Sequence, residues 1–366
     1  MKCLFTLLLI YGLTNLSYAQ KKGSADDWDF SKMIQPVPAQ NMFADPAYNI
    51  WCGSVVKGKN NKYYMFYSRW PRKNGHQDWV RHSEIALAVA DFPGGPFKHL
   101  KVVLPARGAA YWDGVNTHNP YVITYKGKYY LYYIGMTGTA QLEEPAKFGT
   151  RAWWLYRNTQ RIGVAVADNP EADFKRSDKP VFTVNPDTTA FDAVIVSNPA
   201  VTINDKGKVL LMYKGVEKNG KLAGGRVKIG IAFADSPTGP FKRYGRPIME
   251  PKEKSEHWML AEDPYLWFAN KKYYAIVRDV VGKFTGQEGA LALLSSSNAI
   301  DWQVTKHPLV TPPKIKYADG RTSDDRMERP FLMFNDKGMP IVLYGAMGIN
   351  GREHAMNVAV PLKQPQ

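Results

Sequence analysis

Cysteine is almost absent from this sequence of 366 residues, which contains only two. Cys3 lies in the first few residues, and Cys52 is the only cysteine after residue 19, so the remainder of the protein can form no internal disulfide. A small scaffold held together by disulfides is therefore excluded. Burial of apolar side chains must stabilise the fold, and the sequence is long enough for one large domain or two ordinary ones.

Long apolar runs are also absent, apart from one at the start of the sequence. The segment from Leu4 to Leu13 follows Lys2 and precedes Ser17-Tyr18-Ala19, a pattern typical of a secretory signal. It is too short for a transmembrane helix, which needs about 20 apolar residues. We therefore expect a signal peptide over residues 1–19, cleavage near Ala19, and an exported protein in the periplasm or outside the cell, with no membrane span.

The sequence has no basic tract, although it carries 48 Lys and Arg against 33 Asp and Glu, a formal net charge of +15. The basic residues are spread along the whole sequence, which argues against a nucleic-acid partner. Two explanations of the charge stay open. The surface is simply cationic and solvated, or the protein prefers an anionic ligand.

What the sequence does contain is an internal repeat. An apolar strand followed by a turn of Asp, Pro and Gly and the start of another strand occurs three times, and a weaker fourth copy follows. The copies cover residues 85–98, 162–175, 229–242 and 291–302. Upstream of each copy, and once more near the end, lies an apolar strand joined by a polar turn to an aromatic strand. These pairs cover residues 54–67, 121–133, 200–213, 265–277 and 331–344.

Together the two pieces make a four-stranded antiparallel sheet, which is one blade of a β-propeller. The positions that begin the first strand are spaced by 67, 79, 65 and 66 residues, and they are Gly53, Pro120, Pro199, Pro264 and Pro330. This predicts an all-β fold in which residues 20–366 form a single five-bladed propeller. A stacked sandwich is the alternative, but its strands do not normally recur as a four-strand unit.

Two irregularities in the repeat carry further predictions. The last unit is one strand short, so the segment from Ile34 to Phe43 is expected to supply that strand and close the ring. The second interval is longer by about 13 residues, and the excess lies between Met136 and Gln160. Because loops above a blade usually carry function, this insertion is expected to form a wall or lid of a binding cleft.

In a propeller the first residues of all the inner strands meet at one mouth of the central channel. In this sequence they are polar in four of the five units, which predicts a shared polar pocket, since isolated buried charges are costly. Caps and salt bridges between blades are the alternative. These segments are Trp51-Cys52-Gly53, His118-Asn119-Pro120, Ser197-Asn198-Pro199, Glu262-Asp263-Pro264 and Glu328-Arg329-Pro330.

A shorter repeated motif precedes two of these segments. Trp112-Asp113 and Phe191-Asp192 each place an aspartate six residues before an Asn-Pro pair. These aspartates are expected either to face the same mouth or to serve as turn residues.

The blade motif Ile-Gly-Val-Ala-x-Ala-Asp-x-Pro and the strand Gly-Lys-Tyr-Tyr-Leu-Tyr-Tyr resemble those of the five-bladed propeller glycoside hydrolases, the superfamily of families 43, 32, 68, 62 and 117. The resemblance covers roughly residues 45 to 360. It implies action on carbohydrate, with Glu262, two places before Pro264, as the general acid. The two aspartates that this superfamily carries before proline are missing here, because Cys52 stands at one position and Asn119 and Asn198 stand at the other.

Glycoside hydrolysis ordinarily needs a second carboxyl group. Asp113, Asp192 and Glu328 are the candidates for it, and His118 is a candidate proton carrier. The remaining residues are candidates for binding substrate. The arginines are expected to hold a substrate carboxylate or to tune the acids, and the tryptophans to stack on sugar rings. These candidates are Arg161, Arg329, Trp51, Trp112, Trp258, Asn119, Asn198 and Asp263.

The sequence therefore predicts an exported, exo-acting glycoside hydrolase whose partner is a plant or algal oligosaccharide, neutral or anionic. A polysaccharide lyase that uses His118, and a propeller that binds sugar without catalysis, remain as alternatives. No cofactor is expected to be required, although the channel leaves room for a structural cation near His118.

Overall fold

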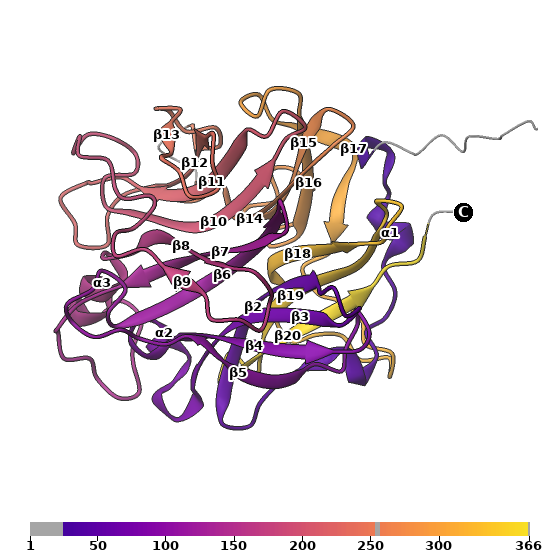
Figure 1. The fold of residues 1–366 in the computed structure, drawn as a ribbon, viewed down its shortest axis with the longest axis horizontal. Helices are drawn as coiled ribbons and strands as arrows, with labels where there is room; N and C mark the ends of the chain where they lie inside the picture. Colours follow the sequence, from indigo (N-terminus) through magenta and orange to yellow (C-terminus); the bar gives the residue numbers. More distant parts are fainter. Residues whose placement is uncertain (1–24, 253–256, 365–366) are drawn as a thin grey trace, which may run out of the picture.

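The computed structural model describes residues 25–252 and 257–364. Five four-stranded antiparallel sheets follow one another around a central channel (Figure 1). The predicted five-bladed propeller is confirmed. The signal peptide predicted over residues 1–19 lies outside the described residues, and within them no helix is both long and apolar enough to cross a membrane.

Four of the blades are formed by consecutive strands, with the innermost strand first. Blade one contains β2 (Tyr48–Lys57), β3 (Tyr63–Pro71), β4 (Glu84–Ala90) and β5 (Lys98–Leu104), and blade two contains β6 (Asn116–Tyr125), β7 (Lys128–Met136), β8 (Arg161–Ala167) and β9 (Lys175–Arg176). Blade three contains β10 (Ile195–Ile203), β11 (Val209–Val216), β12 (Val227–Ala234) and β13 (Lys242–Arg243). Blade four contains β14 (Ala261–Ala269), β15 (Lys272–Asp279), β16 (Leu291–Ser296) and β17 (Gln303–Thr311).

The fifth blade joins the two ends of the protein. Its inner strands are β18 (Glu328–Phe334), β19 (Pro340–Ile349) and β20 (His354–Pro361), and its outermost strand is β1 (Met42–Phe43). Met42 is opposite Val358 and Phe43 is opposite Asn357. The predicted closure by the segment before the first unit is confirmed, and in Figure 1 the indigo N-terminal segment lies beside the yellow C-terminal strands.

Helices are few and short among the described residues. The α-helices are α1 (Phe30–Met33), α2 (Trp79–His82) and α3 (Arg151–Arg157), and the 3-10 helices are η1 (Ala25–Asp27), η2 (Ala39–Asn41), η3 (Arg72–Asn74) and η4 (His76–Asp78). The longest of them, α3, lies in the predicted insertion. The Thr150 hydroxyl oxygen caps it by accepting from the Trp153 backbone N–H at 3.3 Å.

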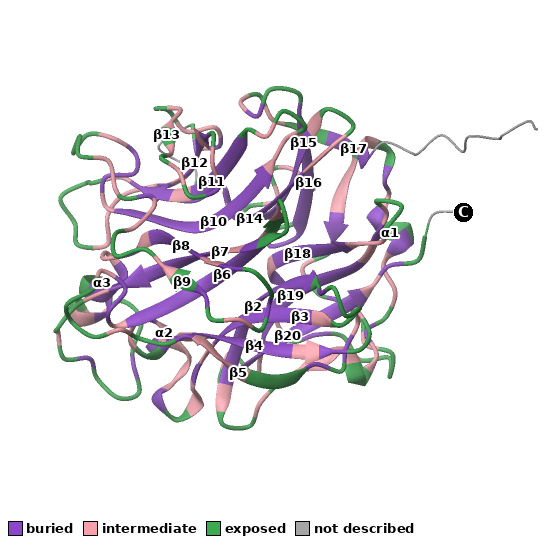
Figure 2. Cartoon of the chain, in the orientation of Figure 1, coloured by how far each residue is buried: buried purple, intermediate pink, exposed green. Residues whose placement is uncertain are grey.

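Burial follows the position of a strand within its blade. Inner strands such as β10 are buried along nearly their whole length, whereas the outer strand β5 is largely exposed (Figure 2). The second strands carry the aromatic residues predicted from the repeat, and these rings fill the space between blades. Fully buried tyrosines on these strands are Tyr64, Tyr67, Tyr132, Tyr133, Tyr213, Tyr274 and Tyr344.

The ring closure makes a prediction about stability. The Phe43 ring meets Tyr67 edge-on at a centroid distance of 4.9 Å, so it joins the closing strand to blade one. We expect Phe43→Ala to lower the free energy of unfolding by about 2 kcal/mol, because the partly buried ring and its aromatic contact are lost. Urea denaturation measures the change. Phe92→Ala, which removes a ring that is 69% exposed, is the control and should change little.

An equal effect of the two phenylalanine variants would show that the closing strand does not stabilise the ring.

Candidate active site

Every inner strand contains a bulge near its first residues. The residue before Gly53, Pro120, Pro199, Pro264 or Pro330 has a left-handed backbone, with φ between 51° and 58°. At the same point the pairing between the inner strand and its neighbour shifts register in all five blades. A bulge bends the strand and re-aims its side chains. The five bulged residues are Cys52, Asn119, Asn198, Asp263 and Arg329.

The side chains of these five residues contact one another across the channel. Asn119 lies 2.9 Å from Cys52 Sγ and 3.0 Å from Asn198 Oδ1, and Asn198 Nδ2 donates to Asp263 Oδ1 at 2.9 Å. Arg329 Nε forms an ion pair with Asp263 Oδ1 at 3.2 Å. Turning the Asn119 amide places its oxygen 2.6 Å from Arg329 Nη2. We call these five residues the axial cluster.

A pocket of about 400 Å³ opens on one side of the axial cluster. Its size is within the range of small-molecule sites. Side chains from the heads of the inner strands form its base, and aromatic residues form its walls. The charged residues that line it are Arg157, Lys214, Glu262, Asp263, Arg278, Arg326, Glu328, Arg329 and Arg352, and the aromatic ones are Trp51, Trp70, His76, Trp79, His118, Phe148, Trp153, Trp154 and Trp258.

The insertion between β7 and β8 contributes one wall of this pocket. Phe148, Trp153 and Trp154 pack edge to face, with ring centroids 4.7 to 5.3 Å apart. Trp153 also meets Trp79 of α2 at 5.7 Å, which fixes α3 against blade one. The segment thus lies where the sequence placed a wall.

Glu262 lies at the head of β14 and is surrounded by cations. Its Oε1 accepts from Lys214 Nζ at 2.6 Å, and its Oε2 accepts from Arg278 Nη2. Burial raises the pKa of Glu262, but Lys214, Arg278 and Arg329 outweigh burial and hold this pKa below its ordinary value. The carboxylate is therefore ionised at neutral pH.

Glu328 occupies the same position in blade five. Its Oε1 accepts from Arg352 Nη2 at 2.8 Å and from Arg326 Nε at 3.0 Å, and Arg278 Nε lies 4.0 Å away. Burial raises the pKa of Glu328, but Arg278, Arg352 and Arg326 lower it to about 2. Glu262 and Glu328 thus share Arg278, which brings two carboxylates from adjacent blades to the base of one pocket.

Asp263 behaves differently from these two glutamates. Burial raises the pKa of Asp263 and outweighs the opposing effect of Arg329. Its Oδ2 accepts no hydrogen bond from the described residues, and Arg278 Nε lies 3.8 Å from this oxygen. The pocket therefore contains one carboxyl group that keeps its proton to a higher pH than its neighbours.

His118 lines the pocket as a buried, neutral side chain. Its Nδ1 lies 2.7 Å from Ser83 Oγ, and its ring stacks on Trp79 at 4.9 Å. Burial lowers the pKa of His118 well below its ordinary value, and Arg329 lowers it further. The imidazole is therefore a hydrogen-bonding group at neutral pH rather than an ionised acid.

Asp113 and Asp192 do not line this pocket. The Tyr133 hydroxyl donates to Asp113 Oδ2 at 2.8 Å, and the Tyr213 hydroxyl donates to Asp192 Oδ2 at 2.9 Å. Arginines from neighbouring segments complete both sites: Arg107 and Arg176 pair with Asp113, and Arg243 pairs with Asp192. The shorter repeated motif in the sequence encodes a repeated packing unit inside the blade, so the expectation that these aspartates face the mouth is corrected.

Two of the substrate-binding candidates also lie elsewhere. The Trp112 ring stacks on Tyr133 at 5.6 Å, and a side chain at Gly135 or Gly163 would collide with it. Arg161 donates to the carbonyl oxygens of Asn158 and Gln160 and is not part of the pocket lining. Both positions were predicted from the sequence as substrate contacts, but Trp112 is held within the blade and Arg161 supports the end of the insertion.

The pocket brings the other candidates together: Glu262, Glu328, His118, Asn119, Asn198, Asp263, Arg329, Trp51 and Trp258 all line it. Sequence reasoning missed Lys214, Arg278 and Arg157. Lys214, on β11, is opposite Ser197, and Arg278, on β15, is opposite Glu262. A basic residue near the end of an otherwise apolar second strand was the available signal for these two.

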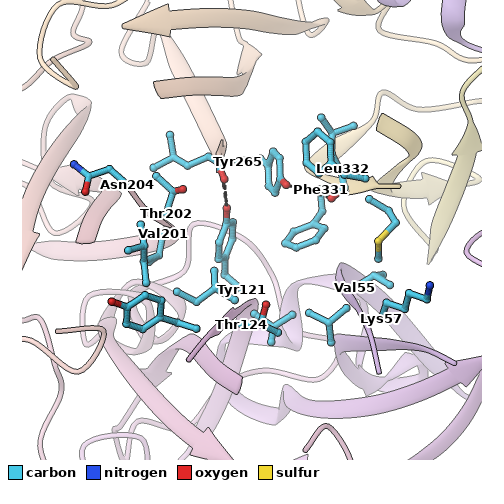
Figure 3. A pocket seen from close by; sticks show the side chains of 18 residues that line it. Val55, Lys57, Tyr121, Thr124, Val201, Thr202, Asn204, Tyr265, Phe331 and Leu332 are labelled. Atoms are coloured by element: carbon cyan, nitrogen blue, oxygen red, sulfur yellow. Dashed lines mark hydrogen bonds between the residues drawn. The ribbon is translucent and has the colours of Figure 1, made fainter. Parts of the chain in front are cut away.

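The opposite end of the channel carries different chemistry. A cavity of about 510 Å³ lies there, lined by residues such as Val55, Val201 and Phe331 and by no carboxylate of the described residues. The Tyr121 hydroxyl donates to the Leu266 carbonyl oxygen at 3.0 Å across this opening (Figure 3). Among the described residues, this larger cavity therefore lacks the paired carboxylates found at the other end.

A cation in the channel finds no suitable set of ligands. Among the described residues no group of three or more His, Cys, Asp or Glu side chains could hold a metal ion. The Arg329 guanidinium already contributes a positive charge to the axial cluster, and His118 Nδ1 contacts Ser83. The described residues therefore offer no such group of ligands. The expectations that no cofactor is required and that the channel leaves room for a structural cation both stay predictions.

Neither a protein-family model nor a curated protein sequence matches this protein. Solved structures do match it. BT0996, in its complex with RGII, is 16% identical with a TM-score of 0.66, over 92% of this protein and 94% of that one. Zg3597, a family 117 glycoside hydrolase from the marine bacterium Zobellia galactanivorans, is 18% identical with a TM-score of 0.59, over 86% of each protein.

An endo-arabinase from Bacteroides thetaiotaomicron is 14% identical with a TM-score of 0.54, over 88% of this protein and 98% of that one. Identities this low show a shared fold and no more. The resemblance to the five-bladed propeller glycoside hydrolases is therefore confirmed for the fold.

The placement of Asp113 predicts a structural role. We expect Asp113→Asn to lower the free energy of unfolding by about 3 kcal/mol, because Arg107 and Arg176 lose their shared carboxylate partner in a buried site. Asp168→Asn is the matched control, since the Asp168–Lys128 ion pair is exposed and should contribute little. Chemical denaturation of both variants measures the difference, and a stable Asp113→Asn protein would contradict this role.

Proposed function

We propose that this protein is a glycoside hydrolase that cleaves sugar units from plant or algal oligosaccharides in the pocket beside the axial cluster. One observation carries the proposal. Two carboxylates, Glu262 and Glu328, lie at the base of an aromatic-walled pocket and contact the same guanidinium, that of Arg278. Glycosidic hydrolysis uses two carboxyl groups that flank one bond, and aromatic walls suit the stacking of sugar rings.

The pKa values favour particular roles. Because cations hold Glu262 and Glu328 in the ionised form, these residues suit the base or nucleophile and the stabilisation of positive charge on the sugar. Asp263 is the carboxyl group with a raised pKa, and we assign it as the candidate proton donor to the leaving oxygen. The family resemblance gave the donor's role to Glu262, but the cations around Glu262 oppose it.

The solved structures support the substrate class by analogy. Their names describe a family 117 glycoside hydrolase, an endo-arabinase and a complex with RGII. The pocket is closed at its base by the axial cluster and bounded on one side by α3, which favours attack at the end of an oligosaccharide. We also propose export, on the N-terminal pattern alone, and recovery of mature protein beginning at Gln20 would test it.

The two alternatives are less well supported. A lyase that pairs His118 with a tyrosine would need a tyrosine in the pocket, and none of the described residues that line it is a tyrosine. A propeller that only binds sugar would explain Cys52 at the position where relatives carry aspartate. Assays for the release of reducing sugar separate that alternative from hydrolysis.

The two glutamates carry the first prediction about activity. We expect wild-type protein to release reducing sugar from an oligosaccharide in a panel of plant and algal glycans, without a product that absorbs in the ultraviolet. Glu262→Gln and Glu328→Gln should each lower this rate by at least about 100-fold, because each removes one of the two charges. Glu84→Gln is the control, since Glu84 forms a similar pair with Arg69 outside the pocket.

Glycan binding without release of reducing sugar would overturn the hydrolase proposal and favour a recognition propeller. An ultraviolet-absorbing product would favour a lyase.

The proton donor can be tested with two kinds of substrate. Asp263→Asn should lower the rate on an oligosaccharide by at least about 100-fold but should spare an activated nitrophenyl glycoside, because nitrophenolate leaves without protonation. Glu262→Gln should slow both substrates. Kinetics on both substrates, with thermal melts to verify folding, provide the comparison. Equal losses on both substrates in Asp263→Asn would assign the proton to another group.

A further inference from the structure

Arg157 differs from every other cation that lines the pocket. It lies in the last turn of α3 and is buried, with 6% of its surface exposed. Its Nη1 donates to Asn158 Oδ1 and to the Ala223 carbonyl oxygen, both at 3.2 Å, and its guanidinium lies 5.3 Å from the centroid of the Trp154 ring. No carboxylate of the described residues lies within 4.0 Å of it.

The remaining pocket cations are all paired with carboxylates. Lys214 and Arg278 pair with Glu262, Arg326 and Arg352 pair with Glu328, and Arg329 pairs with Asp263. Six basic residues thus line the pocket against three acidic ones, which leaves an excess of at least three positive charges. Within the described part of the protein, Arg157 is the pocket cation that makes no ion pair.

A buried and unpaired guanidinium is energetically unfavourable unless something compensates it. Burial lowers the pKa of Arg157 to about 10 although the charge of Glu262 opposes this, so the group still carries its charge at neutral pH. Its planar set of N–H donors matches the two oxygens of a carboxylate, and Nη1 is the only nitrogen bonded to the described residues. The unused donors are therefore available to a ligand in the pocket.

A second orphaned group lies on the same segment. Gln160 is buried, lines the pocket, and its Oε1 accepts no hydrogen bond from the described residues. A sugar hydroxyl is a donor that this oxygen lacks, just as a carboxylate is the acceptor that Arg157 lacks. The wall thus offers a cation and an acceptor, with the Trp153 and Trp154 rings beside them.

We propose that Arg157 binds the carboxylate of an acidic sugar, so that the ligand recognised by this pocket carries a uronate residue. This inference rests on the proposed function in so far as the pocket is a sugar site. It assigns the specificity to the insertion, because α3 carries the unpaired cation while the inner strands carry the reacting carboxylates.

The experiment measures binding separately from hydrolysis. Calorimetric titrations of the wild-type protein compare each uronate with its neutral sugar. The first set is galacturonate, galactose and galactose 6-sulfate, and the second is glucuronate and glucose. We expect a uronate to bind more tightly than its neutral counterpart. Arg157→Gln should weaken uronate binding by at least about tenfold and leave neutral sugars unchanged, and Arg157→Lys should restore part of it.

Arg161→Gln is the matched control, because Arg161 lies near the same segment and donates to backbone carbonyls but does not itself line the pocket. Thermal melts verify that each variant is folded. The proposal is overturned if the uronate and the neutral sugar bind alike, if the sulfate ester binds in place of the uronate, if Arg157→Gln and Arg161→Gln have the same effect, or if no sugar binds.

Hydrolysis by the wild type is followed in parallel, so that the two proposals fail in different ways. Release of neutral and acidic sugars with no dependence on Arg157 would overturn this inference alone. Uronate binding that depends on Arg157, without any release of reducing sugar, would support it and overturn the hydrolase proposal.

Discussion

The left-handed bulge in each inner strand is the constraint on which the pocket depends. Backbone of this kind is uncommon for residues other than glycine, and asparagine and aspartate tolerate it best. Asn119, Asn198 and Asp263 suit the position, whereas Cys52 and Arg329 do not. The conformation persists there because the surrounding strands determine it. The Asn119 backbone N–H, for example, donates to Ser68 Oγ of blade one at 3.0 Å.

The same bulge also orients the residue that precedes it. Trp51, His118, Glu262 and Glu328 all reach the pocket from this place in their strands, while the bulged residues that follow them form the axial cluster. One backbone irregularity repeated in five blades thus supplies the floor of the pocket and most of its reactive groups. The chemistry of the site varies with the side chains at these positions and not with the course of the backbone.

The blades, the ring closure and the position of the pocket could be predicted from the sequence, because each strand pattern recurs in several copies. Five copies of one strand pattern predicted the blades, and a missing strand predicted the closure that β1 provides. The polar strand heads predicted a shared mouth. Asp113 shows the limit of the method: its motif does recur, but whether a recurring aspartate faces a channel or an arginine inside a blade depends on side-chain directions that spacing does not specify.

The cations were missed for a related reason. Lys214 contacts Glu262 across a blade boundary, and Arg352 reaches Glu328 from a hairpin of blade five, so neither pair is close in sequence or in register with the repeat. Arg157 lies in the insertion of blade two, a segment that the repeat does not include. A repeat predicts the features that all blades share. It does not predict the residues that distinguish one blade from the others.

The charges of the site explain why these exceptions matter. Burying Glu262 and Glu328 together would be prohibitive if Arg278 did not lie between them, since two desolvated carboxylates repel each other. Once Arg278 and its neighbours neutralise the acids, any further cation at the pocket is in excess. An anion from outside the protein would compensate that excess. The arrangement that keeps the carboxylates ionised is therefore consistent with the acidic ligand that we propose for this pocket.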